Sequence, residues 1–166
     1  MKPIFPLNTR SLARGAIIAA AYAALTLIFA PISYREVQVR VSEALTLLPV
    51  LMPEAVPALF VGCLLSNLLG GSTVFDIVFG SLATLGAAVC TRRLRGRLPL
   101  AAAMPVVFNG VIVGAVVHYC YSPAFPLPLC MLSVAAGEAV ACFVLGPLLL
   151  RALRRVPRSL TGAEEG

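Results

Sequence analysis

Glu138 is the residue whose chemistry is hardest to reconcile with packing alone. It stands between small neighbours in Ala135-Ala136-Gly137-Glu138-Ala139, inside an apolar run from Leu127 to Leu153. At 1.5 Å per residue it lies roughly 16 Å from the start of this run, near the middle of a membrane. A charge at that depth costs roughly 2.5–3.5 kcal/mol on insertion scales, so such residues mark functional sites by default. We expect Glu138 to bind a ligand; the alternative is a structural carboxylate bonded to a neighbouring helix.

Two asparagines also fall within apolar runs. Asn109 lies at a depth similar to that of Glu138, and Asn67 lies nearer the end of its run. An intramembrane asparagine either contacts a ligand or forms a hydrogen bond between helices. The sequence leaves both interpretations open for both residues.

Two further acidic residues stand at predicted helix starts. Asp76 follows Thr73 by three residues, and Glu43 directly follows Ser42. A carboxylate in the first helical turn favours the helix dipole and can complete a capping box. Capping is therefore the preferred interpretation of both acids, and contact with a ligand is the alternative.

The segment from Tyr34 to Glu43 contains the basic residues Arg35 and Arg40, which stand apart from the other basic residues of the chain. In an extended strand, side chains alternate between two sides. One side would then carry Glu36, Gln38, Arg40 and Ser42, and the other Val37, Val39 and Val41. This pattern predicts a lid with its polar side on a ligand; the alternative is a solvated loop.

Tyrosines gather at the same end of the predicted helices. Tyr34, Tyr119 and Tyr121, together with His118, lie at or beside the ends of apolar runs. An aromatic belt at the membrane interface explains such residues without a ligand. Stacking of a tyrosine on a flat ligand is the second interpretation.

These side chains must be positioned by membrane-spanning helices. Hydrophobic residues make up 60% of the chain and charged residues only 12%, whereas about 25% of a soluble domain is charged. Apolar runs long enough to span a bilayer occupy residues 12–33, 73–91, 100–121 and 127–153. The chain is therefore predicted to be an all-α integral membrane protein.

The stretch 43–70 is either one span or two, because Pro49, Pro53 and Pro57 interrupt it. Short loops rich in Lys and Arg stay in the cytoplasm. Eleven basic residues form three clusters, namely Lys2, Arg10 and Arg14, then Arg92, Arg93, Arg95 and Arg97, then Arg151, Arg154, Arg155 and Arg158. Two spans, 43–52 and 53–70, place every cluster inside.

The result is a bundle of six transmembrane helices over residues 1–156, with both termini in the cytoplasm and a polar tail at 157–166. The chain turns at Met52–Pro53 on the cytoplasmic side. The second helix, from Glu43 to Leu51, is only about 14 Å long as an α-helix. We expect it to be tilted or shielded by neighbouring helices.

Small residues recur at helical spacing in two places. Ala16, Ala20 and Ala24 share one face of the first predicted helix, and Gly110 and Gly114 are four residues apart in the fifth. Such faces allow helices to approach closely, either within the chain or against a partner. The five cysteines have no C-x-x-C spacing and are interpreted as small buried residues rather than metal ligands. Pairing of Cys120 with Cys130 is left open.

Motifs for catalysis are absent from the sequence. It contains no G-x-x-x-x-G-K-[ST] loop for ATP, no H-E-x-x-H metal motif and no G-x-S-x-G nucleophile motif. We therefore expect neither an enzyme nor a cofactor. A few polar groups in a bundle without an energy source indicate capture of a small molecule.

Several of these stretches resemble the QueT family of queuosine-precursor transporters. The resemblance rests on Tyr34-Arg-Glu-Val-Gln-Val-Arg-Val-Ser-Glu-Ala-Leu-Thr-Leu-Leu-Pro49, Gly62-Cys-Leu-Leu-Ser-Asn67, Asp76-Ile-Val-Phe-Gly-Ser-Leu-Ala-Thr84, Asn109 and Gly137-Glu138. It covers nearly all of the chain from Ala13 to Leu150.

The resemblance implies a substrate-binding S-component of an energy-coupling factor (ECF) transporter in a bacterial cytoplasmic membrane. A transmembrane T-subunit and two cytoplasmic ATPases would supply the energy. The alanine-rich face of the first helix, here Ala16, Ala20 and Ala24, would dock the T-subunit among the membrane lipids.

The implied ligand is a 7-deazaguanine, either queuine or an aminomethyl or cyano precursor. A carboxylate accepts the two adjacent donors of a guanine-like edge, and this role is assigned to Glu138. Asn109 or Gln38 would serve the carbonyl or ring nitrogen, and Arg40 or Asp76 the variable substituent. Asn67, Glu43 and Tyr34 complete the candidate ligand-binding residues.

Three alternatives remain at this point. The chain is an S-component for another vitamin or micronutrient, a self-sufficient secondary transporter, or a membrane scaffold without a ligand. A secondary transporter usually shows inverted repeats, which are not visible here.

Overall fold

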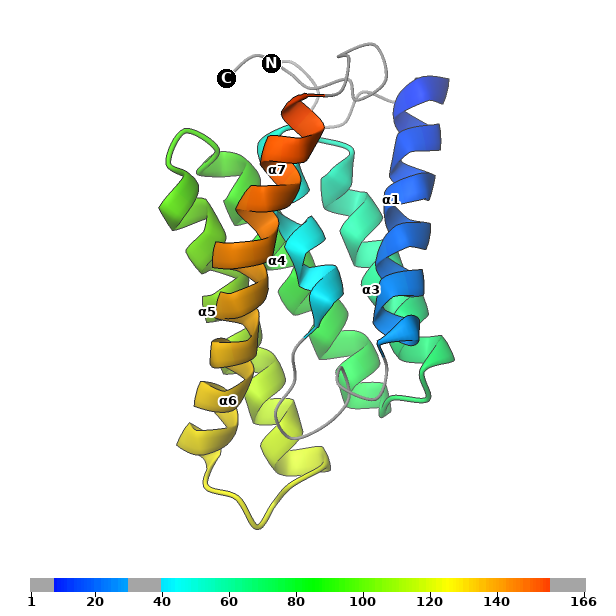
Figure 1. Cartoon of the computed structure of the whole chain (residues 1–166). Coiled ribbons are helices and arrows are strands. Elements are labelled where there is room, and N and C mark those ends of the chain that lie inside the picture. Colours follow the sequence, from blue (N-terminus) through cyan, green and yellow to red (C-terminus); the bar gives the residue numbers. More distant parts are fainter. Residues whose placement is uncertain (1–7, 30–39, 156–166) are drawn as a thin grey trace.

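A computed structural model of the chain describes residues 8–29 and 40–155 (Figure 1). Within these ranges the chain is helical and contains no strand, as the sequence predicts. The elements are α1 (Thr9–Ile28), η1 (Val41–Val50), α3 (Ala55–Leu69), η2 (Asp76–Gly80), α4 (Ser81–Arg93), α5 (Leu98–Cys120), α6 (Leu127–Val140), η3 (Ala141–Leu145) and α7 (Gly146–Arg154). Here η1 is a 3₁₀-helix, and η2 and η3 are π-helical segments.

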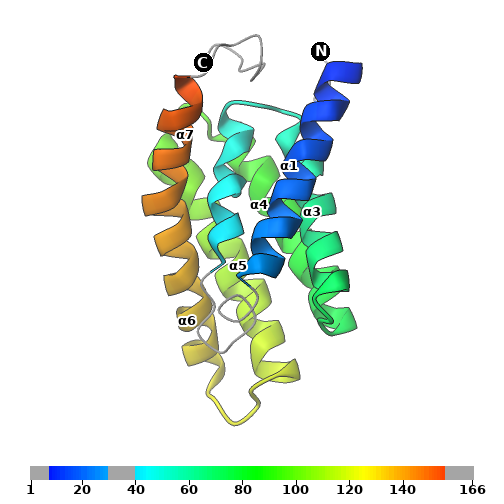
Figure 2. The ribbon, with the colours of Figure 1, turned by 45° about the vertical axis from the view of Figure 1, so that its right-hand side comes forward.

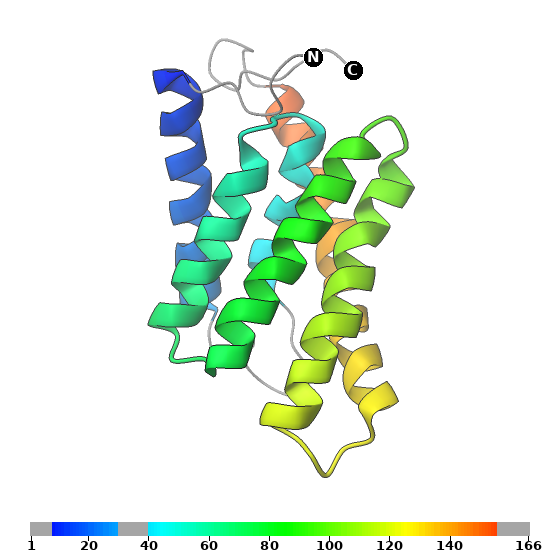
Figure 3. The ribbon, with the colours of Figure 1, turned by 180° about the vertical axis from the view of Figure 1, so that it is seen from behind.

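These elements form six rods that run side by side. η2 continues directly into α4, and α6 continues through η3 into α7. The views from the front and from behind show the rods as one bundle (Figures 1 and 3). Many large apolar side chains on its outer surface are exposed, among them Leu12, Ile17, Val107, Leu132 and Leu148. A surface of that kind suits contact with lipid rather than water.

Arginine-rich helix ends lie together at one end of the bundle, which we call the basic end. The start of α1, the end of α4, the start of α5 and the end of α7 meet there, at the top of Figure 1. The turn at Met52–Pro53 lies at the same end. Six crossings require these helix ends and this turn to lie at the same end of the bundle.

Three of the described helices are long and apolar enough to cross a membrane. They are Thr9–Ile28, Leu98–Cys120 and the continuous run Leu127–Arg154. η1 and α3 are shorter apolar helices. The chain is therefore a multi-pass membrane protein in which short helices are packed among long ones.

The short rod η1 occupies the centre of the bundle. It contacts α1, α3, α4, α5, η3 and α7, and Figure 2 shows it between α1 and α7. Every residue of η1 after Val41 is buried. A 3₁₀-helix rises about 2.0 Å per residue, so ten residues extend roughly 20 Å, against about 15 Å in α-helical form. The expected shielding is present, and the 3₁₀ geometry adds reach that an α-helix of this length lacks.

Arginines stand at both ends of the central rod, and one of them is bonded to it. Arg40 immediately precedes η1, and Nη1 of Arg92 donates to the carbonyl oxygen of Pro49 at 3.1 Å. The last carbonyls of a helix lack intrahelical partners, and a cation favours their negative dipole end. Arg92 of α4 therefore supplies a donor to a backbone carbonyl at the C-terminus of η1, on the side of the basic end.

Glycines allow two pairs of helices to approach closely. A Cβ on Gly62 of α3 would lie 2.9 Å from the carbonyl oxygen of Ala19 in α1, and a Cβ on Gly114 of α5 would lie 2.6 Å from the Cα of Met131 in α6. Gly110 similarly faces Ala135. The Gly110 and Gly114 face thus packs within the chain.

Gly62→Ala is expected to destabilise the protein because backbone and Cβ atoms of α1 block the added methyl group. Overpacking of this kind costs about 1–3 kcal/mol, which we expect to lower the thermal midpoint by several degrees. Gly96→Ala is the matched control, since a Cβ there would meet no atom within 4 Å. Thermal unfolding of the detergent-solubilised variants measures both, and equal midpoints would contradict the close α1–α3 contact.

Candidate functional site

Six of the predicted site residues converge in the interior. Arg40, Glu43, Asn67, Asp76, Asn109 and Glu138 are each at most 4% exposed and come from η1 with its preceding residue, α3, η2, α5 and α6. We call these six residues the polar cluster. Polar groups at this depth must find their partners inside the protein, because lipid offers none.

One side of the polar cluster is built around Glu43 and Glu138. Nδ2 of Asn109 donates to Oε1 of Glu138 at 3.0 Å, and the hydroxyl of Tyr22 donates to Oε1 of Glu43. Sγ of Cys142 lies 3.9 Å from Oε2 of Glu138 and 3.7 Å from the carbonyl oxygen of Glu43. These contacts join α1, η1, α5, α6 and η3 at one place.

The other side is built around Asp76. Its Oδ2 lies 3.8 Å from Nη2 of Arg40 and accepts a hydrogen bond of 3.3 Å from the hydroxyl of Tyr121. The backbone carbonyl oxygen of Asp76 accepts a hydrogen bond of 3.3 Å from Nδ2 of Asn67. Because Tyr121 is 44% exposed, this side of the polar cluster lies closest to the end of the bundle opposite the basic end.

Asp76 and Glu43 both lie in the first turn of a helix, as the helix-cap interpretation expects, but neither carboxylate completes a capping box. Oγ1 of Thr73 does accept a hydrogen bond from the backbone N–H of Asp76 at 3.3 Å. The carboxylate of Asp76, however, turns to Tyr121 and Arg40 instead of returning to the backbone of Thr73. Glu43 makes no side-chain cap on η1, because its carboxylate faces Tyr22 of α1.

Irregular helical segments flank the polar cluster. Asp76 begins the π-helical η2, Glu138 lies just before the π-helical η3, and Glu43 lies in the 3₁₀-helix η1. π-bulges and 3₁₀ stretches within helices occur frequently at functional sites, because they rotate side chains out of the regular helical register. Gly80 at the end of η2 leaves room as well, since a Cβ there would lie 3.1 Å from Oδ1 of Asp76.

Several buried acceptors in the polar cluster lack a hydrogen-bond donor among the described residues. They are Oε2 of Glu43, Oδ1 of Asn67, Oδ1 of Asp76 and Oδ1 of Asn109. An unsatisfied buried polar group costs about 1–3 kcal/mol, so native proteins keep few of them. Four on neighbouring side chains therefore indicate a site that accepts hydrogen bonds from a bound molecule.

The charge of the polar cluster is unbalanced. Arg40 is its single cation, and Glu43, Asp76 and Glu138 are its three acids. A buried carboxylate without a counter-charge is strongly unfavourable. The polar cluster is therefore suited to a molecule that brings N–H donors and positive charge.

Sequence reasoning missed or undervalued three residues at this site. Tyr22 and Cys142 sit in apolar stretches and were not singled out, and Tyr121 was interpreted as part of an aromatic belt. A tyrosine within an alanine-rich apolar run is a usable sequence signal, because its hydroxyl needs a partner when the helix is packed.

The predicted lid lies largely outside the described residues. Tyr34 and Gln38 fall in the undescribed range 30–39. The extended alternation does not continue to Ser42, because Val41 and Ser42 already belong to η1. Arg40, at the near end of this segment, is buried in the polar cluster.

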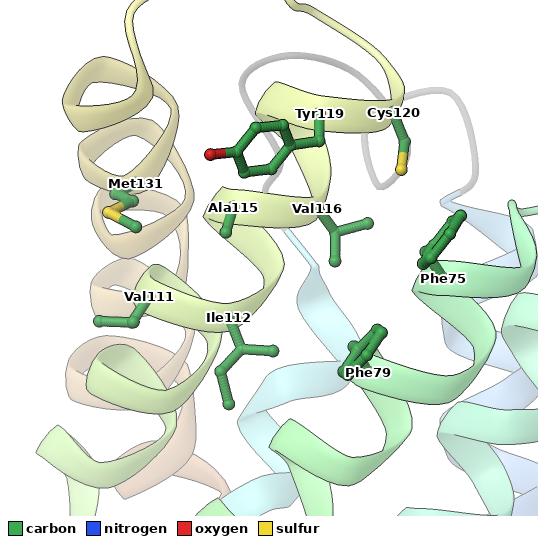
Figure 4. A pocket seen from close by; sticks show the side chains of 9 residues that line it. All are labelled: Phe75, Phe79, Val111, Ile112, Ala115, Val116, Tyr119, Cys120 and Met131. Carbon is green, nitrogen blue, oxygen red and sulfur yellow. The ribbon is translucent and has the colours of Figure 1, made fainter.

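An apolar groove lies on the surface beside the polar cluster (Figure 4). It encloses about 680 Å³ and is lined by Phe75, Phe79, Val111, Ile112, Ala115, Val116, Tyr119, Cys120 and Met131. The stacked rings of Phe75 and Phe79 stand opposite Ile112 and Val116 of α5. Since no lining residue carries a charge, this groove does not supply the contacts that the polar cluster offers.

Metal ligands do not gather in the described part of the chain, where no group of three or more His, Cys, Asp or Glu residues could hold an ion. All five cysteines are free thiols. Cys120 and Cys130, whose pairing the sequence left open, are therefore unpaired.

Comparison with known proteins gives one match. Residues 12–155 match the model of a family described as QueT transporter. No curated protein and no solved structure matches the chain. The family resemblance drawn from the sequence is confirmed over nearly the whole chain.

Arg40→Met is expected to destabilise the protein strongly, because it leaves the three acids of the polar cluster without a cation. Breaking a buried ion pair from one side costs about 3–5 kcal/mol. The exposed Arg93 at the basic end provides the control, and Arg93→Met is expected to change stability by at most about 0.5 kcal/mol. Thermal unfolding in detergent compares the two; similar midpoints would show that Arg40 does not balance the acids.

Proposed function

Because the chain belongs to the QueT transporter family, we propose that it is the substrate-binding S-component of an ECF transporter and captures a 7-deazaguanine base. The observation that carries this proposal is the polar cluster, with its buried unsatisfied acceptors and its excess of acidic groups. Membership of a transporter family also favours binding and delivery over catalysis.

The chemistry of a 7-deazaguanine complements the polar cluster. Its guanine-like edge presents a ring N–H next to an amino group, and the five-membered ring adds another N–H. Carboxylate and amide oxygens are the natural acceptors of these donors, and bonds to a carboxylate are roughly twice as strong as neutral ones. Oε2 of Glu43 and Oδ1 of Asn109 are already buried and lack donors among the described residues.

We assign the guanine-like edge to the pair of Glu43 and Glu138. Glu138 alone was the sequence-based choice, but its Oε1 already accepts the amide of Asn109, whereas Oε2 of Glu43 has no described partner. The ligand would exchange contacts such as Asn109–Glu138 for its own. Asn109 would then offer either its amide group to the carbonyl or its oxygen to a donor.

We assign the substituent at position 7 to Asp76. This acid lies beside the partly exposed Tyr121, so a substituent there would point toward the end opposite the basic end. With two more acids than cations in the polar cluster, a protonated amine is the favoured substituent over a neutral nitrile. Arg40 and Asn67 would hold Asp76 in place, and Gln38 and Tyr34 would contribute from the segment before η1.

The same family membership supports a proposal for the partners. Ala16, Ala20 and Ala24 of α1 are all exposed, whereas Ala19 and Ala23 are buried within the chain. A smooth exposed face of small residues permits close approach of another membrane helix. We propose that it docks a T-subunit, which two cytoplasmic ATPases drive.

The proposed setting is a bacterial cytoplasmic membrane. The basic end of the bundle would face the cytoplasm, as the positive-inside rule requires. The Asp76 side of the polar cluster would then open to the outside, where the ligand arrives.

Ligand affinity is expected to depend on the acids of the polar cluster. Glu43→Gln and Glu138→Gln each remove a charge-assisted hydrogen bond worth about 1.5–3 kcal/mol, so 7-aminomethyl-7-deazaguanine should bind roughly 10- to 100-fold more weakly. Titration calorimetry on the purified chain measures this change.

The matched control is Glu54→Gln. Glu54 is also buried, but it pairs with Arg14 at the basic end, where Nε and Oε1 are 2.7 Å apart. Its substitution should leave affinity unchanged. If wild-type protein binds no 7-deazaguanine but binds another micronutrient, the ligand assignment is wrong and the S-component role survives.

The role of Asp76 separates two ligands. Asp76→Asn should weaken binding of 7-aminomethyl-7-deazaguanine by about tenfold or more, because it removes the partner of a protonated amine. The same variant should bind 7-cyano-7-deazaguanine as wild type does. An equal loss for both ligands would place Asp76 in the scaffold of the site and not at the substituent.

Docking is expected to fail when the alanine face of α1 is blocked. Ala20→Trp places a large ring on this face and should abolish co-purification with the T-subunit while leaving ligand affinity intact. Leu132→Trp is the control, since Leu132 is exposed on α6, away from α1. Intact co-purification of the Ala20→Trp variant would exclude this face.

A further inference from the structure

Tyr22 connects the polar cluster to α1 through a buried hydrogen bond. Its side chain is fully buried, and its hydroxyl donates to Oε1 of Glu43. This bond uses one oxygen of the Glu43 carboxylate and leaves Oε2 as the oxygen without a described donor. The position of Tyr22 therefore decides which oxygen of Glu43 is available to a ligand.

A second hydrogen bond joins the same two helices one turn further along α1. Oγ1 of Thr26 donates to Oγ of Ser42 at 2.7 Å, next to Glu43 in η1. Tyr22 and Thr26 are four residues apart, so both project from one face of α1. The helix is thus hydrogen-bonded to the two residues that begin the buried part of η1.

Another face of α1 is free of the bundle. Ala16, Ala20 and Ala24 are exposed there, while Ala19 and the Cβ of Tyr22 pack against Gly62 of α3. A single helix therefore carries a contact to the polar cluster on one side and the proposed docking face on the other. Figure 2 shows α1 on one side of η1 and the rod of α6 and α7 on the other.

We infer that Tyr22 is a positioning residue that links occupancy of the polar cluster to the state of α1. A ligand bound to Oε2 of Glu43 fixes the carboxylate, and a fixed carboxylate holds the Tyr22 hydroxyl and with it α1. The ligand would shift the equilibrium by holding the carboxylate in the one orientation in which it accepts the Tyr22 hydrogen bond. The inference rests on the proposed function, since it takes the ligand and the docking face from it.

Coupling of this kind is reciprocal. If the ligand stabilises α1 against η1, then a partner that holds α1 in the same position raises ligand affinity by the same factor. The alanine face and the ligand site would communicate through one phenol group, without a change in the fold.

Amide hydrogen exchange of α1 tests the link in the purified full chain. With 7-aminomethyl-7-deazaguanine as the probe, exchange of the amides from Ala19 to Thr26 should slow in the wild type. Tyr22→Phe keeps the ring and removes the hydroxyl. The variant should still bind, with affinity reduced by about tenfold or less, but the ligand should no longer slow exchange in α1.

Tyr119→Phe is the matched control, because Tyr119 on α5 is 72% exposed. This substitution should change neither the ligand affinity nor the exchange of the α1 amides. Thr26→Val, which removes the second bond with little change in shape, should reduce the ligand-dependent protection in part. A purely structural Tyr22 would change α1 exchange equally with and without ligand. Full ligand-dependent protection in Tyr22→Phe, or no protection in a wild type that does bind the ligand, would overturn the inference.

Failure of the proposed function has a different signature. If the wild type binds no 7-deazaguanine, the ligand assignment fails, and the link is judged on the free protein. Tyr22→Phe should then speed the exchange of α1 amides relative to Tyr119→Phe. Unchanged exchange in the free variant would show that the hydroxyl does not hold α1, and would reject the link independently of any ligand.

Discussion

The enclosure of η1 by the other helices is the constraint on which the rest of the structure depends. This ten-residue helix contacts all of the remaining rods of the bundle and is buried from Ser42 to Val50. In a membrane each buried polar group needs a partner from the protein. The neighbours of η1 therefore have to supply partners at both of its ends, and they do so differently. Arg92 closes the end near the basic end, whereas the opposite end meets Tyr22, Thr26 and the polar cluster.

Irregular geometry also occurs in the helices that surround η1. A 3₁₀-helix presents its side chains in a narrower pattern than an α-helix, and its neighbours must match that pattern locally. The π segment η3 contacts η1 directly, and Asp76 at the start of the π segment η2 pairs with Arg40, the residue that precedes η1. Gly146 in α7 and Gly80 in η2 remove side chains where Leu47 and Asp76 need space. The polar cluster is thus a product of packing around η1 and not of any one helix.

This origin explains which features were predictable from the sequence. The clustering of arginines predicts that residues 43–70 form two crossings and not one kinked helix. Hydropathy and helical rise place Glu138 and Asn109 at a similar depth, and in the structure these two side chains are hydrogen-bonded. Other features depend on contacts between helices. A pattern read along one segment favours a cap for Glu43, because it cannot show that Tyr22, twenty-one residues away, donates to the carboxylate. The 3₁₀ form of η1 likewise depends on the helices that surround it, and no residue pattern in the sequence predicts it.

The internal contacts of the polar cluster bear directly on selectivity. Each of the three acids has a partner in the apolar interior. Asn109 bonds to Glu138, Tyr22 bonds to Glu43, and Arg40 pairs with Asp76. A ligand that enters has to replace part of these contacts, so a molecule with too few donors gains less than it displaces. On the proposed function, an apolar molecule would leave the acids unpaired and would be rejected for that reason. On the same proposal, a donor-rich, positively charged base would both replace the lost contacts and reduce the acidic excess. The same imbalance that makes the empty site unfavourable would then make it selective.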